Sequence, residues 1–120
     1  MKHADDEPRI FHILREDALE THMSPFGRVG KIFSGEGVEA VWVKKQREEI
    51  DPDWFSQRMV DLILVVAGKL NMEFERPDLP SCVLEPGDLV VLPPATRCRA
   101  YRWPRDAEDA ALFVAIYPIS

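Results

Sequence analysis

Throughout the second half of the chain, short apolar segments alternate with turn-forming residues, and no segment has a sustained helical periodicity. Met59–Ala67 is almost continuously apolar, Gly68 forms a turn, and Lys69–Glu75 then alternates between apolar and polar side chains. Turns at Pro86-Gly87-Asp88 and Pro93-Pro94 enclose another short apolar segment. Strands this short, with turns about every 8–12 residues, are typical of an all-β sandwich or barrel. The sequence therefore predicts an antiparallel, double-sheet β-barrel of the jelly-roll kind.

The alternation along these segments also predicts which side chains fill the core, because residues two apart on a strand share a face. We expect the following residues to be largely buried: Leu62, Ile63, Leu64, Val65, Leu70, Met72, Phe74, Leu89, Val91, Leu112 and Val114. The segment Leu62–Val66 is apolar at both parities, and Ala110–Tyr117 is nearly so. One face fills the barrel, and the other needs cover from the second sheet, the N-terminal segment or a second copy, which favours a homodimer.

The length and charge of the chain limit its organisation and its partners. With 120 residues it is expected to form one domain, residues 1–120, in which residues 1–30 are an N-terminal extension that packs on the barrel. A formal net charge of −6 disfavours nucleic acid and acidic membranes as partners. No apolar run approaches the ~20 residues of a membrane span, and no signal peptide is recognisable. We therefore expect a cytoplasmic protein in which Cys82 and Cys98 are reduced thiols.

Two motifs carry a resemblance to a known family. Asp61 is followed by an apolar run that ends at Gly68, and the turn Pro86-Gly87-Asp88 is followed by a short strand and a proline. Over residues 53–117 the chain therefore resembles a small single-domain cupin of the cupin 2 conserved-barrel type. The resemblance implies a jelly-roll β-barrel with a ligand site inside it. It also adds weight to the homodimer, because small cupins commonly dimerise.

The chain departs from the cupin motifs where those motifs carry metal-binding histidines. The His-x-His pair of the first motif falls on Phe55 and Gln57. If the spacing is one residue longer, the pair falls on Trp54 and Ser56. The histidine of the second motif falls on Cys98. None of these positions holds a histidine, so the resemblance implies a degenerate metal-binding motif.

The histidines of the chain all lie in its N-terminal part: His3, His12 and His22. For this reason no metal and no other cofactor is predicted. An atypical transition-metal site would need Gln57, Asp61 and Cys98 as ligands, with His12 or His22 folding back toward them. Glutamine is a poor ligand compared with histidine, and nothing in the histidine spacing indicates such a site.

Asp61 is the leading candidate for a functional residue. If its strand is regular, Gln57 and Asp61 share one face, which the resemblance places inside the barrel near Cys98. A carboxylate there must be paired, hydrogen-bonded or liganded, or its pKa rises. Its partner could be Gln57, or Arg102, which has the strand parity of Cys98. It could also be a bound ligand, toward which Asp61 could act as a catalytic acid.

The other candidates have both structural and ligand-binding interpretations. Trp54 and Phe55 stand where a sugar or another planar ligand could stack at the barrel mouth, although aromatic residues in a barrel usually belong to the core. Cys98 is either a small core residue or a soft ligand. The predicted ligand-binding set consists of Trp54, Phe55, Gln57, Asp61, Cys98 and Arg102.

From these residues we expect a cupin-like protein that binds a small molecule, whose identity the sequence leaves open. The missing histidines favour binding without the usual metal site. The alternative is an enzyme, either one like a sugar isomerase or epimerase that uses Asp61, or a metalloenzyme with an atypical site of Asp61, Gln57 and Cys98. A third hypothesis is an interaction module that works as a dimer. Whether the protein is catalytic stays open at this point.

Overall fold

The computed structural model describes residues 7–15, 19–46 and 50–119, and the regular elements of this part of the chain are all β-strands. In chain order these are β1 (Thr21–Ser24), β2 (Gly27–Gly35), β3 (Val38–Lys45), β4 (Asp61–Ala67), β5 (Leu70–Phe74), β6 (Cys82–Leu84), β7 (Leu89–Leu92), β8 (Cys98–Arg102) and β9 (Ala111–Pro118). Across these three ranges, no helix is long and apolar enough to cross a membrane.

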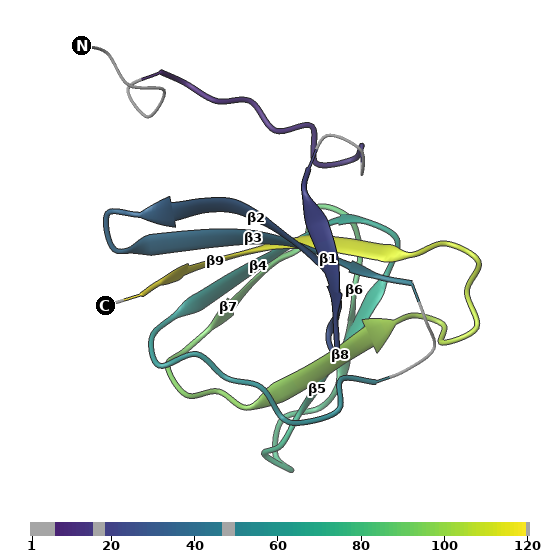
Figure 1. Ribbon diagram of the computed structural model, residues 1–120. Coiled ribbons are helices and arrows are strands. Elements are labelled where there is room, and N and C mark those ends of the chain that lie inside the picture. Colours follow the sequence, from purple (N-terminus) through teal and green to yellow (C-terminus); the bar gives the residue numbers. More distant parts are fainter. Residues whose placement is uncertain (1–6, 16–18, 47–49, 120) are drawn as a thin grey trace.

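The strands form two antiparallel sheets that face each other across the core (Figure 1). The larger sheet has six strands in the order β1-β2-β3-β9-β4-β7, and the smaller has three in the order β6-β5-β8. Long-range antiparallel pairings join β3 to β9 and β9 to β4, as in a jelly roll. The predicted all-β, antiparallel double-sheet architecture is confirmed, with two sheets rather than one closed barrel.

The β4–β5 turn depends on Gly68, as the sequence predicts. This residue has a φ of +66°, a conformation that side chains with a Cβ rarely adopt. A Cβ built at this position would lie 2.1 Å from the backbone oxygen of Ala110, which belongs to the segment before β9. Glycine is therefore required both by the turn and by the close approach of another backbone.

The second predicted turn, Pro86-Gly87-Asp88, docks against the side of β4. The backbone N–H of Gly87 donates to the oxygen of Val65 at 2.8 Å, and the N–H of Val65 donates to the oxygen of Asp88 at 3.0 Å. Asp88 also closes the turn locally, because its carboxylate accepts from the backbone N–H of Glu85 at 2.8 Å. These bonds fix β7 beside β4.

The core lies between the sheets, and most of its members come from one parity of each strand. The buried apolar cluster comprises Val43, Ile63, Val65, Leu70, Met72, Leu84, Leu92, Cys98, Ala100, Ala111, Phe113 and Ala115. Of the residues that we expected to be buried, six are: Ile63, Val65, Leu70, Met72, Leu112 and Val114. Three more are half-buried: Leu62, Leu64 and Phe74.

The prediction was wrong for β7. Leu89 and Val91 are 57% and 58% exposed, whereas Leu92 is buried and Val90 packs against the core. The whole strand is apolar, so alternation alone could not identify its inner face. The pairing of Leu89 and Val91 with residues on the outer side of β4 decides it, and the opposite parity points inward.

The outer face of the larger sheet is partly covered by the segment that precedes β1. Trp42 on β3 is 1% exposed, and its indole N–H donates to the backbone oxygen of Ile13 at 2.7 Å. Among residues 7–15, Arg9 also reaches this sheet, because its guanidinium carbon lies 5.6 Å from the centroid of the Phe33 ring on β2. Within the predicted extension 1–30, β1 and the start of β2 are strands of the six-stranded sheet.

Candidate functional site

A cavity of about 220 Å³ lies between the two sheets. Its walls are mostly aliphatic and aromatic, and its polar lining consists of Ser24, Lys45, Asp51, Gln57, Asp61 and Tyr117. An apolar cavity of roughly 150 Å³ is large enough to bind benzene. The space is therefore sufficient for a small organic molecule held by a few polar contacts.

The structure brings four of the predicted site residues to this cavity: Phe55, Gln57, Asp61 and Cys98. A short bridge joins the segment before β4 to β8, since Phe55 N–H donates to Cys98 O at 2.7 Å and Cys98 N–H donates to Phe55 O at 2.9 Å. This bridge places Gln57 and Asp61 on the same side as Cys98. Whether these residues bind a ligand stays a prediction.

The other two predicted residues lie elsewhere. Trp54 does not line the cavity, and the Arg99 guanidinium lies over its ring at 4.3 Å from the ring centroid. Arg102 stands at the opposite end of β8 from Cys98, where its Nε–H donates to the backbone oxygen of Arg105 at 3.1 Å. Arg102 lines a separate surface pocket, so it is not the partner of Asp61.

Asp61 is a buried carboxyl group in apolar surroundings. It begins β4, is 3% exposed, and faces inward together with Ile63 and Val65. Its Oδ1 accepts no hydrogen bond from the residues that the structure describes. Burial raises the pKa of Asp61 to about 6, because removal of water disfavours the charged form.

Gln57 does engage a partner, but that partner is Tyr117 on β9. The Tyr117 hydroxyl donates to Glu39 Oε2 at 3.1 Å, and a hydrogen bond from Gln57 to the same hydroxyl favours the ionised phenol. Burial is the main cause that raises the pKa of Tyr117 to about 12, and Glu39 adds to it. The three side chains form a polar chain from the cavity to the beginning of β3.

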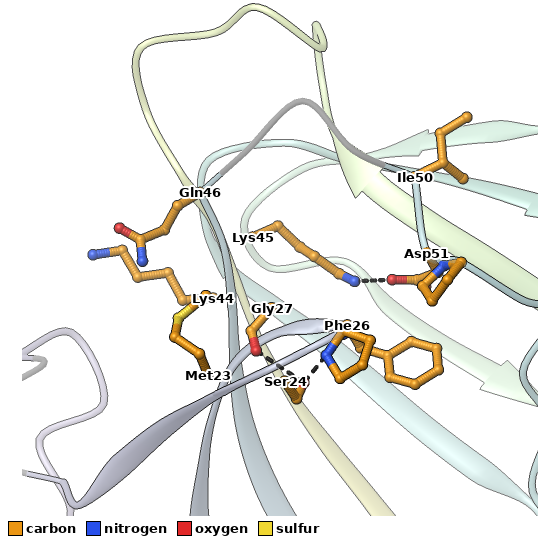
Figure 2. Close-up of a pocket in the computed structure, with 11 residues that line it drawn as sticks. Met23, Ser24, Phe26, Gly27, Lys44, Lys45, Gln46, Ile50 and Asp51 are labelled. Carbon is orange, nitrogen blue, oxygen red and sulfur yellow. Dashed lines mark hydrogen bonds and ion pairs between the residues drawn. The ribbon is translucent and has the colours of Figure 1, made fainter.

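Lys45 and Asp51, which the sequence analysis missed, form a buried ion pair in the cavity wall (Figure 2). Their side chains are 7% and 9% exposed. Asp51 Oδ2 also accepts from the backbone N–H of Ala100 at 2.9 Å. The sequence did contain one indication that Lys45 points inward. Alternate residues of a strand share a face, and Lys45 follows Val41 and Val43 on the inward face of β3.

The ion pair also borders a second, outer pocket of about 310 Å³, which Figure 2 shows. Met23, Lys44 and Gln46 line this outer pocket and not the inner cavity. Four residues line both spaces: Ser24, Phe26, Lys45 and Asp51. The ion pair and the Phe26 ring therefore form the partition between the two.

The donors at the cavity fit a transition metal poorly. Glutamine is a poor ligand compared with histidine, and Gln57 stands where the cupin motif has one of its histidines. Burial raises the pKa of Cys98 to about 12, and the negative charges of Asp61 and Asp51 add to that effect. His12 and His22 are exposed and do not line the cavity. Within the described ranges, no three His, Cys, Asp or Glu side chains are grouped as metal ligands would be.

No protein-family model matches the sequence, and no curated protein matches it significantly. Solved structures do match. A proposed mannose-6-phosphate isomerase from Ralstonia eutropha JMP134 has a TM-score of 0.73 at 16% identity, over 94% of this chain and 100% of that one. A Cupin 2 conserved barrel domain protein from Salinispora arenicola CNS-205 has a TM-score of 0.69 at 13% identity, over 95% and 89% of the two chains. KdgF from Halomonas sp. has a TM-score of 0.67 at 22% identity, over 88% and 94%. The chain therefore has the fold of a small cupin domain.

Proposed function

We propose that this protein binds a small, largely apolar molecule in the cavity between its sheets, and that Asp61 is the polar anchor of that molecule. The observation that carries the proposal is the buried, unpartnered Oδ1 of Asp61. A buried acceptor without a hydrogen bond costs about 1–3 kcal/mol. A ligand that donates to Asp61 recovers this free energy, while the apolar walls bind the rest of the molecule.

Binding without a transition metal belongs to the same proposal. It is supported by the poor ligand character of the Gln57 amide, and by the finding that the described residues contain no group of three His, Cys, Asp or Glu side chains that could hold a metal. Metal analysis of the purified protein tests it, with background zinc, iron, nickel and manganese as the expected result. Stoichiometric metal that is lost in Asp61→Asn would overturn the metal-free proposal.

The binding experiment uses the methionine methyl groups as reporters of position. Met72 lines the inner cavity and Met23 lines the outer pocket. A small-molecule set is screened by NMR on protein with ¹³C-labelled methionine methyl groups. We expect hits that shift the Met72 signal and leave Met23 unchanged, and that weaken in Asp61→Asn but not in the exposed control Asp53→Asn. Hits that shift only Met23 would contradict binding between the sheets.

A second candidate function is an enzyme that uses Asp61 as a proton donor and acceptor. A pKa of about 6 lies close to neutral pH, where a carboxyl group is useful in general acid–base catalysis. One similar structure carries the name of a sugar-phosphate isomerase. Turnover of an aldose or ketose phosphate that Asp61→Asn abolishes would favour this candidate over simple binding.

We also propose a homodimer through the outer face of β4, β7 and β9. Leu89 and Val91 on the edge strand β7 and Ile116 on β9 are 57%, 58% and 41% exposed, and Leu62 lies between them on β4. A two-fold axis beside this edge would place the apolar face of one copy against the same face of another. Sedimentation should show a dimer that Val91→Lys dissociates, with Val83→Lys as the control. A wild-type monomer at micromolar concentration would refute this proposal.

A further inference from the structure

We infer that the molecule bound between the sheets is a small organic cation, an amine with an apolar body, whose nitrogen pairs with the Asp61 carboxylate. This inference rests on the proposed binding function and adds the chemical class of the ligand. It follows from the charges that line the cavity, from the partners that those charges already have, and from the aromatic and polar groups beside Asp61.

The charged side chains of the cavity wall are one lysine and two aspartates: Lys45, Asp51 and Asp61. Lys45 and Asp51 neutralise each other as an ion pair, and Asp51 has a second donor in the backbone N–H of Ala100. Among the charged side chains that the structure describes in the cavity wall, Asp61 therefore carries the one negative charge that no opposite charge neutralises. A cavity with one surplus negative charge is complementary to a ligand with one positive charge.

The low polarity of the walls makes this complementarity strong. Charges attract more strongly where water is excluded, and an uncompensated buried charge is costly. A cationic ligand compensates Asp61, a neutral alcohol supplies only a hydrogen bond, and a carboxylate ligand adds repulsion. The net charge of −6 over the whole chain acts in the same direction, because it attracts small cations and repels small anions.

An ammonium group has three N–H donors, and the surroundings of Asp61 offer more than one acceptor. Gln57 lines the same cavity, and the carbonyl oxygen of its side chain is a second acceptor for such a group. Phe26 and Phe55 also line the cavity, in edge-to-face contact with their centroids 5.7 Å apart, and Lys45 Nζ already lies 5.9 Å from the Phe26 centroid. Aromatic faces attract cations, so the Phe55 ring suits an amine better than an anion.

The test compares three probes of nearly equal size and shape: benzylamine, benzyl alcohol and benzoate. Binding is measured by calorimetry, and the Met72 methyl signal shows whether each probe is in the cavity. We expect benzylamine to bind at least about tenfold more tightly than benzyl alcohol, and benzoate more weakly than either. In Asp61→Asn the preference for the amine should disappear, while the exposed control Asp53→Asn keeps it.

The outcomes separate this inference from the function on which it rests. If benzyl alcohol binds in the cavity as tightly as benzylamine, the ligand is not a cation, although the binding function stands. If benzoate binds most tightly, the charge argument is wrong. If none of the three binds at millimolar concentration, both proposals fail. The comparison of probes on the wild-type protein decides the question even if Asp61→Asn does not fold.

Discussion

Asp51 and Asp61 are two aspartates in the wall of one cavity, and they are held in opposite ways. Asp51 has a partner for each oxygen, because Lys45 pairs with Oδ1 and the N–H of Ala100 donates to Oδ2. Asp61 is at least as deeply buried, yet its Oδ1 has no partner in the described part of the chain. Burial alone therefore does not distinguish a structural carboxylate from a functional one, whereas the hydrogen-bond partners do.

The two residues should consequently affect stability in opposite directions. Asp51 ties the segment after β3 to β8, and its loss leaves a buried lysine without its counter-charge. The negative charge of Asp61 is a cost to the folded protein until something binds to it. Four measurements test this difference between Asp51 and Asp61.

The largest effect is expected for Asp51→Ala. Removal of one partner of a buried ion pair costs about 3–5 kcal/mol, because the other charge stays in the interior without compensation. Urea unfolding should show this loss relative to wild type, and Asp53→Ala at an exposed position serves as the control. The double variant Lys45→Met with Asp51→Leu should recover part of it. A loss below about 1 kcal/mol would mean that the pair is effectively solvated.

Asp61→Asn should instead stabilise the protein at neutral pH. The pKa of Asp61 is about 6 in the folded state and 3.8 as its ordinary value, so the folded state binds protons more tightly. The stability of the wild type is then highest below pH 4 and falls as the pH rises through 6. The variant should gain about 2–3 kcal/mol at pH 7 and nothing below the ordinary pKa. Unfolding at several pH values measures this gain, and an equal effect at all pH values would contradict it.

Tyr117→Phe tests the polar chain beside Asp61. The change removes the hydroxyl that donates to Glu39 and accepts from Gln57, and we expect a loss of about 1 kcal/mol in the free energy of unfolding. Benzylamine binding should weaken a few-fold, because Gln57 is no longer oriented. Tyr101→Phe, outside the cavity, is the matched control. An unchanged affinity would show that Asp61 acts without Gln57.

The smallest effect concerns the Cys98 thiol. Burial is the main cause of its raised pKa, and among the nearby charges Asp61 contributes more than Asp51. Alkylation of Cys98 by iodoacetamide should therefore speed up a few-fold in Asp61→Asn, and less in Asp51→Asn after correction for stability. Mass spectrometry follows the reaction, with Cys82 as the internal reference. The reverse order would mean that Asp51 is the less compensated charge.

The sequence predicted the architecture because its turns are local and chemically specific. Gly68 and Pro86-Gly87-Asp88 stand where the structure places its turns, and the family resemblance implied the inward position that the structure gives Asp61. The alternation of apolar and polar residues could not predict the inward face of β7, because every residue of this strand is apolar. On a fully apolar strand, the pairing with neighbouring strands decides which side chains point inward.

The buried ion pair was missed for a different physical reason. Lys45 ends one strand, whereas Asp51 lies in the loop beyond it and is positioned by Ala100 on β8. Such a pair depends on a contact between distant parts of the chain, which no local pattern records. Arg102 was predicted at the site although it lies outside the cavity. It shares a face of β8 with Cys98, but it stands at the other end of the strand.

The partition between the two pockets affects how fast a ligand enters and leaves the inner cavity. A ligand that passes from the outer pocket to the inner cavity must displace Phe26 and part the Lys45–Asp51 ion pair. Along this route both kon and koff are limited by how often that pair separates, and a weakly bound molecule can still have a long residence time. We predict that Phe26→Ala increases both rates, and koff more than kon because the ring also lines the inner cavity, which NMR exchange measurements would show. An unchanged kon would place the route elsewhere.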